Sequence, residues 1–285
     1  MFQMFDNYED SYNNSESDTE VEQQPDYFQI NYQVPYSEDR FNRIFENCIY
    51  KGEYQNNLFH GNGEITDKNG DYYVGEFKYG YAYGHVNIYY KNGDHYIGEV
   101  KYNKPHGKGK LYFNNGSSYE GDFERGKRDG CGKLKINNGN YYEGELYNNK
   151  FNGYGRFTYI DNFEISYKEG FWSDNILNGN ATILRKNGTT YVGNVIDSLE
   201  HGYGIEFYEN NKIKYTGNWK NGKYDGHGIF NNFLGSKIYC GFFKCGLRHG
   251  DGEEYVSNCK RIFYGKYKYG MRHGSGYELA KRKFI

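Results

Sequence analysis

From about residue 50 onward, short runs of alternating residue types dominate the chain. In one run Tyr96, Gly98 and Val100 share one face, while Ile97 and Glu99 share the other. A second run soon follows in the same unit and alternates glycine with lysine in the same way. Alternation with a period of two predicts β-strands that present one face to a core. The pattern therefore predicts an all-β protein.

The pair of runs recurs as a unit of nearly constant length. Most units open with a tyrosine two positions before a glycine, and Gly-x-Gly follows later in the unit. The opening glycines are Gly52, Gly75, Gly98, Gly121, Gly144, Gly170, Gly193, Gly217, Gly241 and Gly265. Successive glycines are 23, 23, 23, 23, 26, 23, 24, 24 and 24 residues apart. A period of this length is typical of a stacked array of one supersecondary unit. Because such an array offers an extended surface rather than a pocket, the repeat argues against an enzyme.

The recurring glycines need a structural reason, because glycine weakens a strand. Close approach of a large side chain is the usual one, and the chain has 35 Tyr and is 20% aromatic. We expect the aromatic rings of one run to lie over the glycines of the other. Since a single sheet cannot bury both faces, we also expect a long aromatic stripe to be exposed as an interface.

Turn residues join the units. Five Asn-Gly pairs lie between the second run of one unit and the first run of the next: Asn69-Gly70, Asn92-Gly93, Asn115-Gly116, Asn138-Gly139 and Asn187-Gly188. Asn-Gly suits the two positive-φ positions of a type I′ turn, so consecutive units should pair as an antiparallel meander. The long interval before Gly170 predicts a bend or a β-bulge there.

The repeated sequence resembles the MORN (membrane occupation and recognition nexus) repeat. The resemblance rests on Tyr-x-Gly-x-aromatic, on His-Gly-x-Gly, and on a glycine at the hairpin tip such as Gly80, Gly126 or Gly222, and it covers residues 50–280. It implies an elongated antiparallel β-meander of about ten tandem β-hairpins. It also implies the roles of that family, whose members look like scaffolds, tethers and membrane-associated platforms.

The ends of the chain differ from the repeats. Residues 1–36 are acidic and poor in apolar side chains, so we expect them to be largely disordered. Residues 37–48 have an N-cap serine and helical spacing, which predicts a short capping helix or, alternatively, a docking helix for a partner. The array then spans 49–276, and 277–285 form a basic tail. The first 48 residues hold 11 acidic and 2 basic residues, so the array itself is basic although the net charge is −2.

No group of residues indicates catalysis or metal binding. Segments 121–127 and 217–223 have nearly the glycine spacing of a phosphate-binding loop, but neither is followed by Ser or Thr or by a helix. Five histidines occupy one slot of separate units, roughly 9–10 Å apart in a meander, which is too far to share a zinc ion. The densest set of zinc-type ligands lacks zinc-site spacing: Cys240, Cys245, His249 and Cys259. We expect no enzyme, no cofactor and no metal.

Basic residues gather in the last unit and the tail: Lys260, Arg261, Lys266, Lys268, Arg272, Lys281, Arg282 and Lys283. Such a cluster is a candidate site for acidic phospholipids or an acidic partner protein. The alternative is ordinary solubility charge, or a landing place for the acidic N-terminal segment. The net charge of −2 and the lack of a recognised module argue against nucleic acid.

These features favour a non-catalytic scaffold or tether that presents an extended β-sheet surface to other proteins at cytoskeletal or membrane-linked structures. We expect it to form a homodimer. The alternative is a peripheral binding module for acidic phospholipids or phosphoinositides. The 5 scattered cysteines suit a reducing compartment, and no segment resembles a signal peptide or a membrane span. We therefore expect a cytoplasmic protein, associated with the cytoskeleton or a membrane.

Overall fold

The computed structural model describes residues 48–256 and 260–279, which lie in the compact unit Asn47–Ile285. The segment expected to be disordered, 1–36, lies outside the described residues. So does the expected capping helix, 37–48, except for Cys48, which has no regular secondary structure.

Twenty β-strands make up the described part of the chain. In the first half they are β1 (Ile49–Gln55), β2 (Leu58–Thr66), β3 (Tyr72–Lys78), β4 (Tyr81–Tyr89), β5 (His95–Lys101), β6 (Lys104–Tyr112), β7 (Ser118–Glu124), β8 (Lys127–Lys135), β9 (Tyr141–Tyr147) and β10 (Lys150–Thr158). In the second half they are β11 (Ile165–Ser173), β12 (Ile176–Arg185), β13 (Thr190–Ile196), β14 (Leu199–Phe207), β15 (Ile213–Lys220), β16 (Lys223–Asn231), β17 (Lys237–Lys244), β18 (Leu247–Tyr255), β19 (Arg261–Lys268) and β20 (Met271–Glu278).

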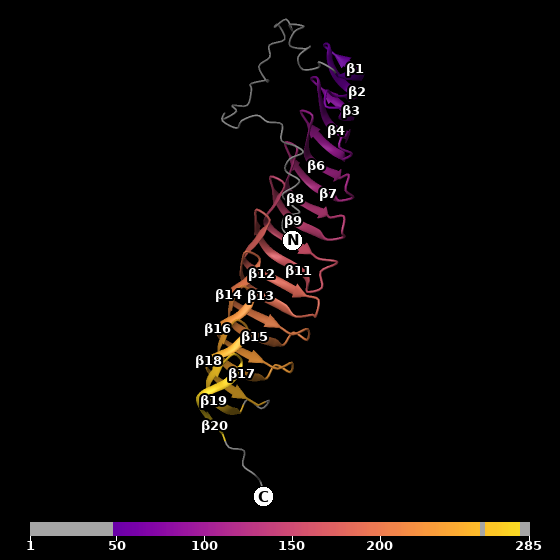
Figure 1. Cartoon of the computed structure of the whole chain (residues 1–285). Helices are drawn as coiled ribbons and strands as arrows, with labels where there is room; N and C mark the ends of the chain where they lie inside the picture. Colours follow the sequence, from indigo (N-terminus) through magenta and orange to yellow (C-terminus); the bar gives the residue numbers. More distant parts are fainter. Residues whose placement is uncertain (1–47, 257–259, 280–285) are drawn as a thin grey trace, which may run out of the picture. The chain divides into compact units, whose positions relative to one another are not determined.

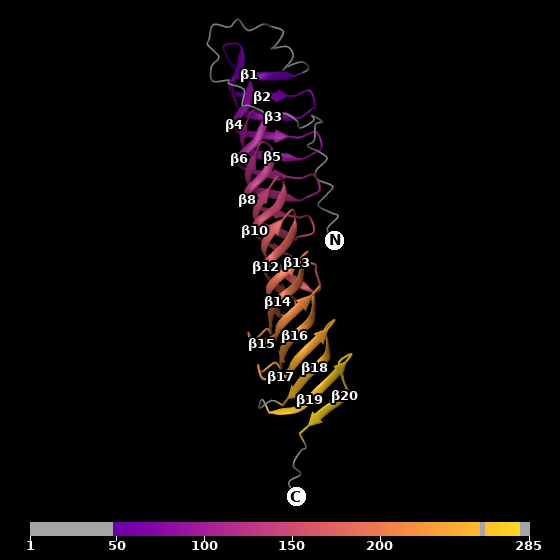
Figure 2. The same cartoon turned by 90° about the vertical axis from the view of Figure 1, so that its left-hand side faces the viewer.

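Each strand pairs antiparallel with the next one along the chain, so that one open sheet results. Figures 1 and 2 show the strands following one another in chain order. The predicted all-β antiparallel meander is therefore confirmed. Tyr277 and Glu278, which were assigned to the tail, pair within β20, and residues 280–285 lie outside the described part of the chain.

A row of glycines crosses the whole sheet. Gly98 pairs with Gly109, Gly109 with Gly121, and Gly121 with Gly132. The same register holds at every other junction, with Val86 and Ala181 as the two exceptions. The repeat length is therefore set by the need to bring one glycine per strand into line.

Tyrosine rings lie over this row on one side of the sheet, which we call the aromatic face. A Cβ atom added to Gly109 would lie 2.2 Å from the Tyr96 hydroxyl oxygen, so only glycine fits beneath the ring. The Tyr96 hydroxyl donates a hydrogen bond to the carbonyl of Glu99, at 2.6 Å. Seven tyrosines donate the same bond to the residue three positions on: Tyr50, Tyr96, Tyr119, Tyr142, Tyr191, Tyr215 and Tyr239.

The rings are covered from the other side as well. The ring of Phe151 stacks on Tyr142 at 3.8 Å, and Trp172 of the next repeat meets the same ring edge-on at 5.8 Å. Tyr96 and Tyr142 are 0% exposed as a result. The expectation of an exposed aromatic stripe is therefore wrong for these rings, because each hairpin folds its own tip over them and the aromatic face becomes the core.

A wide bulge in each hairpin makes this folding possible. Gly98 pairs with Gly109 and Val100 with Pro105, so one residue on the first strand lies opposite three on the second. Gly107 is one of these three residues, and its φ of 62° lies in the left-handed region that favours glycine. The Glu99 carboxylate accepts a hydrogen bond from the Lys108 N–H inside the bulge, at 3.1 Å. A bulge bends its strand, and here it turns the tip of the hairpin back over the rings.

The turns between the repeats differ from the prediction. In the predicted type I′ turns only the glycine has positive φ, as in Gly93 at 93°, and Gly93 N–H donates to the carbonyl of Tyr90. This geometry matches a type I turn with a glycine bulge. Asn92 is favoured there because its side chain accepts a hydrogen bond from the N–H of Asp94, at 2.9 Å.

The type I′ geometry occurs instead at the tips inside the repeats. Both central residues have positive φ at every tip: Asn56-Asn57, Tyr79-Gly80, Tyr102-Asn103, Arg125-Gly126, Asn148-Asn149, Asp174-Asn175, Asp197-Ser198, Asn221-Gly222, Cys245-Gly246 and Tyr269-Gly270. A two-residue type I′ turn matches the twist of its strands, so it tolerates even tyrosine or arginine at a left-handed position.

Repeats longer than 23 residues carry extra bulges. Pairing skips one residue in each 24-residue step: Lys214, Ile238 and Ile262. In the 26-residue step the pairing skips Ser166, which confirms the predicted irregularity before Gly170. These insertions leave the glycine row in register.

We expect Gly109→Ala to destabilise the fold by about 1–3 kcal/mol, because the new methyl group would overlap the buried Tyr96 ring. Gly116→Ala serves as the control, since its Cβ would lie 3.8 Å from the nearest side chain and only its φ of 87° opposes the change. Urea unfolding of both variants measures the difference. An unchanged urea midpoint in Gly109→Ala would show that the ring contact does not limit this position.

We expect Cys245→Asn to stabilise the fold by about 0.5–1 kcal/mol, because asparagine occupies the left-handed region at lower cost. The reciprocal change, Asn221→Cys, converts a matching tip and should destabilise by a similar amount. Both residues precede a tip glycine, with φ of 51° and 50°. Denaturant midpoints measure the pair, and a change of the same sign in both variants would contradict the turn assignment.

Burial raises the pKa of Tyr96, Tyr119 and Tyr142 above the usual value of 10.0. Above pH 10 the unfolded chain loses these phenolic protons while the folded sheet keeps them, so stability must fall as pH rises. We expect the urea midpoint to be flat below pH 9 and to drop steeply above pH 10. A urea midpoint that stays constant from pH 9 to pH 11 would contradict this expectation.

Candidate protein-interaction face

The side of the sheet opposite the tyrosine rings, which we call the outer face, is built by the residues next to the row glycines. In a strand, neighbouring side chains point to opposite faces, so the residues before and after each glycine project outward. The result is two rows of outward side chains with the glycine backbone between them. The charge of the side chains in these rows changes between β11 and β12.

From β6 to β11 the two rows are mostly charged, and we call this part the charged half. Nine of its twelve positions are charged: Lys108, Lys110, Glu120, Asp122, Lys133, Glu143, Glu145, Arg156 and Glu169. The other three are Cys131, Tyr154 and Phe171. Opposite charges face one another across strands, which is the favourable arrangement.

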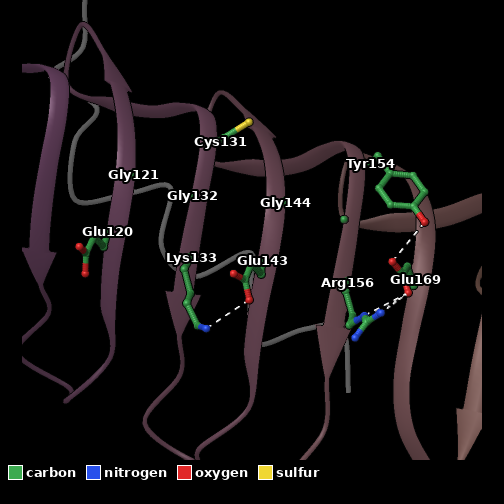
Figure 3. A pocket seen from close by; sticks show the side chains of 11 residues that line it. Glu120, Gly121, Cys131, Gly132, Lys133, Glu143, Gly144, Tyr154, Arg156 and Glu169 are labelled. Atoms are coloured by element: carbon green, nitrogen blue, oxygen red, sulfur yellow. Dashed lines mark hydrogen bonds and ion pairs between the residues drawn. The ribbon is translucent and has the colours of Figure 1, made fainter.

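Figure 3 shows the glycine-floored groove of the charged half. It holds about 630 Å³ above Gly121, Gly132 and Gly144. Lys133 pairs with Glu143 at 3.2 Å along one wall. Arg156 pairs with Glu169 in the same groove. Because these ion pairs leave little unmatched charge, we do not expect the groove to bind a strongly charged ligand.

An ion pair in the charged half shifts the pKa of both of its partners. Lys110 lies 2.9 Å from Glu120. The hydrogen bond between them raises the pKa of the lysine and lowers that of the carboxyl group. Both groups therefore stay charged near neutral pH, and neither is suited to acid–base catalysis.

From β12 to β17 the same two rows carry no Asp, Glu, Lys or Arg, and we call this part the uncharged half. Its positions are Asn180, Thr182, Val192, Asn194, Tyr203, Ile205, Thr216, Asn218, His227, Ile229, Cys240 and Phe242. Val192 is 44% exposed and Tyr203 62%. Depletion of charge together with exposed aromatic and aliphatic side chains is the compositional mark of a protein interface.

Comparison with known families follows the same repeats. The MORN repeat matches nine segments, which cover more than half of the chain: 50–72, 96–118, 119–141, 142–162, 169–190, 191–212, 215–231, 239–259 and 263–279. The chain belongs to the MORN repeat family. The hairpin of β3 and β4 is the repeat that lies largely between the matched segments, and it is also the one in which Val86 replaces a row glycine.

Similar solved structures add little to the family assignment. The TCP10 domain of Danio rerio CPAP is 12% identical with a TM-score of 0.38, and the match covers 73% of this MORN chain and 90% of that one. The SAS-4 (dCPAP) TCP domain of Drosophila melanogaster, in complex with a proline-rich motif of Ana2, is 14% identical with a TM-score of 0.27 and covers 54% and 81%. TM-scores this low do not support an inference about the function of this chain. The comparison with curated proteins found no match.

The predicted basic cluster sits at the last hairpin of the MORN array. Three of its described residues are in ion pairs: Arg261 with Glu253 at 2.6 Å, Lys266 with Asp251 at 2.8 Å, and Arg272 with Glu254 and, at 3.1 Å, with Glu278. Lys268 lies over the Tyr269 ring, and Lys260 is exposed just before β19. Lys281, Arg282 and Lys283 lie outside the described residues. Most of the described charge is therefore matched by β18, whose carboxylates the linear sequence does not place beside it.

Other sequence candidates do not form a site in the described part of the MORN array. There, no group of three or more His, Cys, Asp or Glu side chains could hold a metal ion. Residues 121–127 and 217–223 form a strand that runs into a type I′ tip. No helix among the described residues has the length and apolar character needed to cross a bilayer.

The uncharged half was missed by sequence reasoning, although its signal is present. Reading only the two neighbours of each row glycine in β12–β17 reveals twelve uncharged positions. When the strand register is not known, these positions cannot be separated from the charged tip and turn residues of the same repeats, and the lack of charge goes unnoticed.

Proposed function

We propose that this MORN array is a non-catalytic scaffold that binds a partner protein through the uncharged half of its outer face. The observation that carries the proposal is the change from nine charged positions in twelve to none, on the same rows of one sheet. Charge depletion favours burial against another protein, because no ion has to be stripped of water.

Two other surfaces of the described sheet suit this role less well. The tyrosine rings are the core of the array, so they hold the repeats together rather than meeting a partner. Ion pairs along β6–β11 satisfy the charged half internally. The uncharged half remains, with Val192, Ile205 and Ile229 in one line across strands.

Several finer expectations stay predictions of the sequence. They are the homodimer, the acidic phospholipid partner, and the cytoplasmic location with its cytoskeletal or membrane-linked site. The homodimer is compatible with the proposed surface, because a second copy is one kind of protein partner.

A double substitution tests the proposal. Val192→Lys with Thr216→Lys places two cations in the uncharged half, and we expect partner affinity to fall at least about tenfold because each charge must be desolvated on binding. The control, Lys133→Thr with Glu143→Val, makes the opposite exchange in the charged half and should leave affinity unchanged. Tagged wild-type protein first isolates the partner from source cells, and titration of the purified partner then gives the dissociation constants.

Light scattering completes the experiment. A dimeric wild-type protein that becomes monomeric in the lysine variant would identify the partner as a second copy. Binding that survives in the lysine variant but is lost in the control would place the interface on the charged half and overturn the proposal. Thermal unfolding of both variants shows whether the sheet itself is intact.

A further inference from the structure

The row of rings over the glycines is interrupted once, in the sixth repeat. The residue two positions before the row glycine is aromatic in nine repeats: Tyr50, Tyr73, Tyr96, Tyr119, Tyr142, Tyr191, Tyr215, Tyr239 and Phe263. In the sixth repeat Lys168 occupies that position, and Ala181 replaces the glycine opposite Gly170. A lysine therefore occupies a core position that is aromatic in the other nine repeats.

Lys168 is buried without a counter-ion. Its side chain is part of a residue that is only 8% exposed, and its ammonium group donates one hydrogen bond, to the carbonyl of Ser198 at 2.8 Å. Within the described part of the chain it makes no ion pair. Burial lowers the pKa of this lysine, while Glu200 raises it and Arg185 lowers it further. An ammonium group has three donors, so two are left without a partner among the described residues.

The neighbouring charges are already matched to one another. Arg185 binds the carboxylates of Glu200 and Glu206, the latter at 3.1 Å. Lys214 lies 3.3 Å from Glu206 as well. Of the three cations in this group, Lys168 is the one with no carboxylate at ion-pair distance among the described residues.

A cavity of about 480 Å³ opens beside Lys168. Ile165, Ile183 and Leu199 form apolar walls. The charged residues at the cavity are Lys168, Arg185, Glu164 and Glu200. Phe163, on the turn before β11, borders it and is 97% exposed. The volume accommodates a few side chains of a short peptide segment, since a water molecule takes up about 30 Å³.

We propose that this cavity binds a carboxylate side chain, flanked by apolar residues, from a peptide segment of a partner protein, with Lys168 as its counter-ion. A carboxylate gives Lys168 the counter-ion that it lacks and accepts hydrogen bonds from its two free N–H donors, and the apolar walls receive the residues that flank it. A phosphate dianion would bring two negative charges close to Glu164 and Glu200, so a singly charged carboxylate is favoured. The site faces away from the uncharged half, so this proposal does not depend on the proposed function.

Methyl NMR on the full-length protein tests the site directly. The probe is the acetylated, amidated tripeptide leucine–glutamate–leucine, compared with its glutamine and phosphoserine counterparts. We expect the glutamate peptide to shift the δ1-methyl signals of Ile165 and Ile183 in a saturable way. The glutamine peptide should bind at least about tenfold more weakly, because it loses a charge-assisted hydrogen bond.

Substitutions at Lys168 separate binding from folding. Lys168→Met removes the charge at similar length, so it should weaken the glutamate peptide at least about tenfold while raising the melting temperature. Lys168→Arg keeps the charge and should retain binding, and Lys220→Met, at an exposed lysine, should behave as wild type. Equal affinity for glutamate and glutamine peptides, tighter binding of phosphoserine, no shift at the two isoleucines, or unchanged binding in Lys168→Met would each overturn the proposal.

Discussion

The contact of a tyrosine ring with a bare glycine is the interaction on which the described sheet depends. The ring lies against the glycine backbone of the paired strand, and its hydroxyl donates to a carbonyl at the bulge, as Tyr96 does to Glu99. A change of either partner alone has a cost: a methyl group on the glycine would overlap the ring, and loss of the hydroxyl would leave a buried carbonyl without its donor. Val86 and Phe263 mark the two hairpins in which one partner alone has changed. The recurrence of this unit in most hairpins accounts for both the repeat and its near-constant length.

This interaction also determines which surface is left for function. Because bulges fold the hairpin tips over the rings, a single sheet manages to bury one of its faces almost completely. The face that looked like an interface in the sequence is the core, and the opposite face meets the solvent. Along that outer face, charge pairing in β6–β11 and its absence in β12–β17 give two adjoining six-strand stretches of one sheet a different chemistry.

The turns show how far local sequence reasoning reaches. Asn-Gly was a sound signal for a turn at residues 92–93, but its asparagine serves as a side-chain acceptor for Asp94 rather than as a left-handed residue. The left-handed pairs lie at tips that include Tyr102 and Cys245, which no propensity would select. There the twist of the paired strands imposes the turn type, and the local sequence only tolerates it.

The sequence by itself determined the repeat, the β-class, the meander and the glycine–aromatic contact, because all of these are written in a short period of residues close along the chain. Only the tertiary structure decided which face is buried, which carboxylates neutralise Arg261 and Arg272, and that Lys168 enters the core without one. These properties depend on which side chains the register places opposite each other across strands. A skipped residue such as Lys214 or Ile238 shifts the pairing only at the strand end beside it, and the glycine row stays in register.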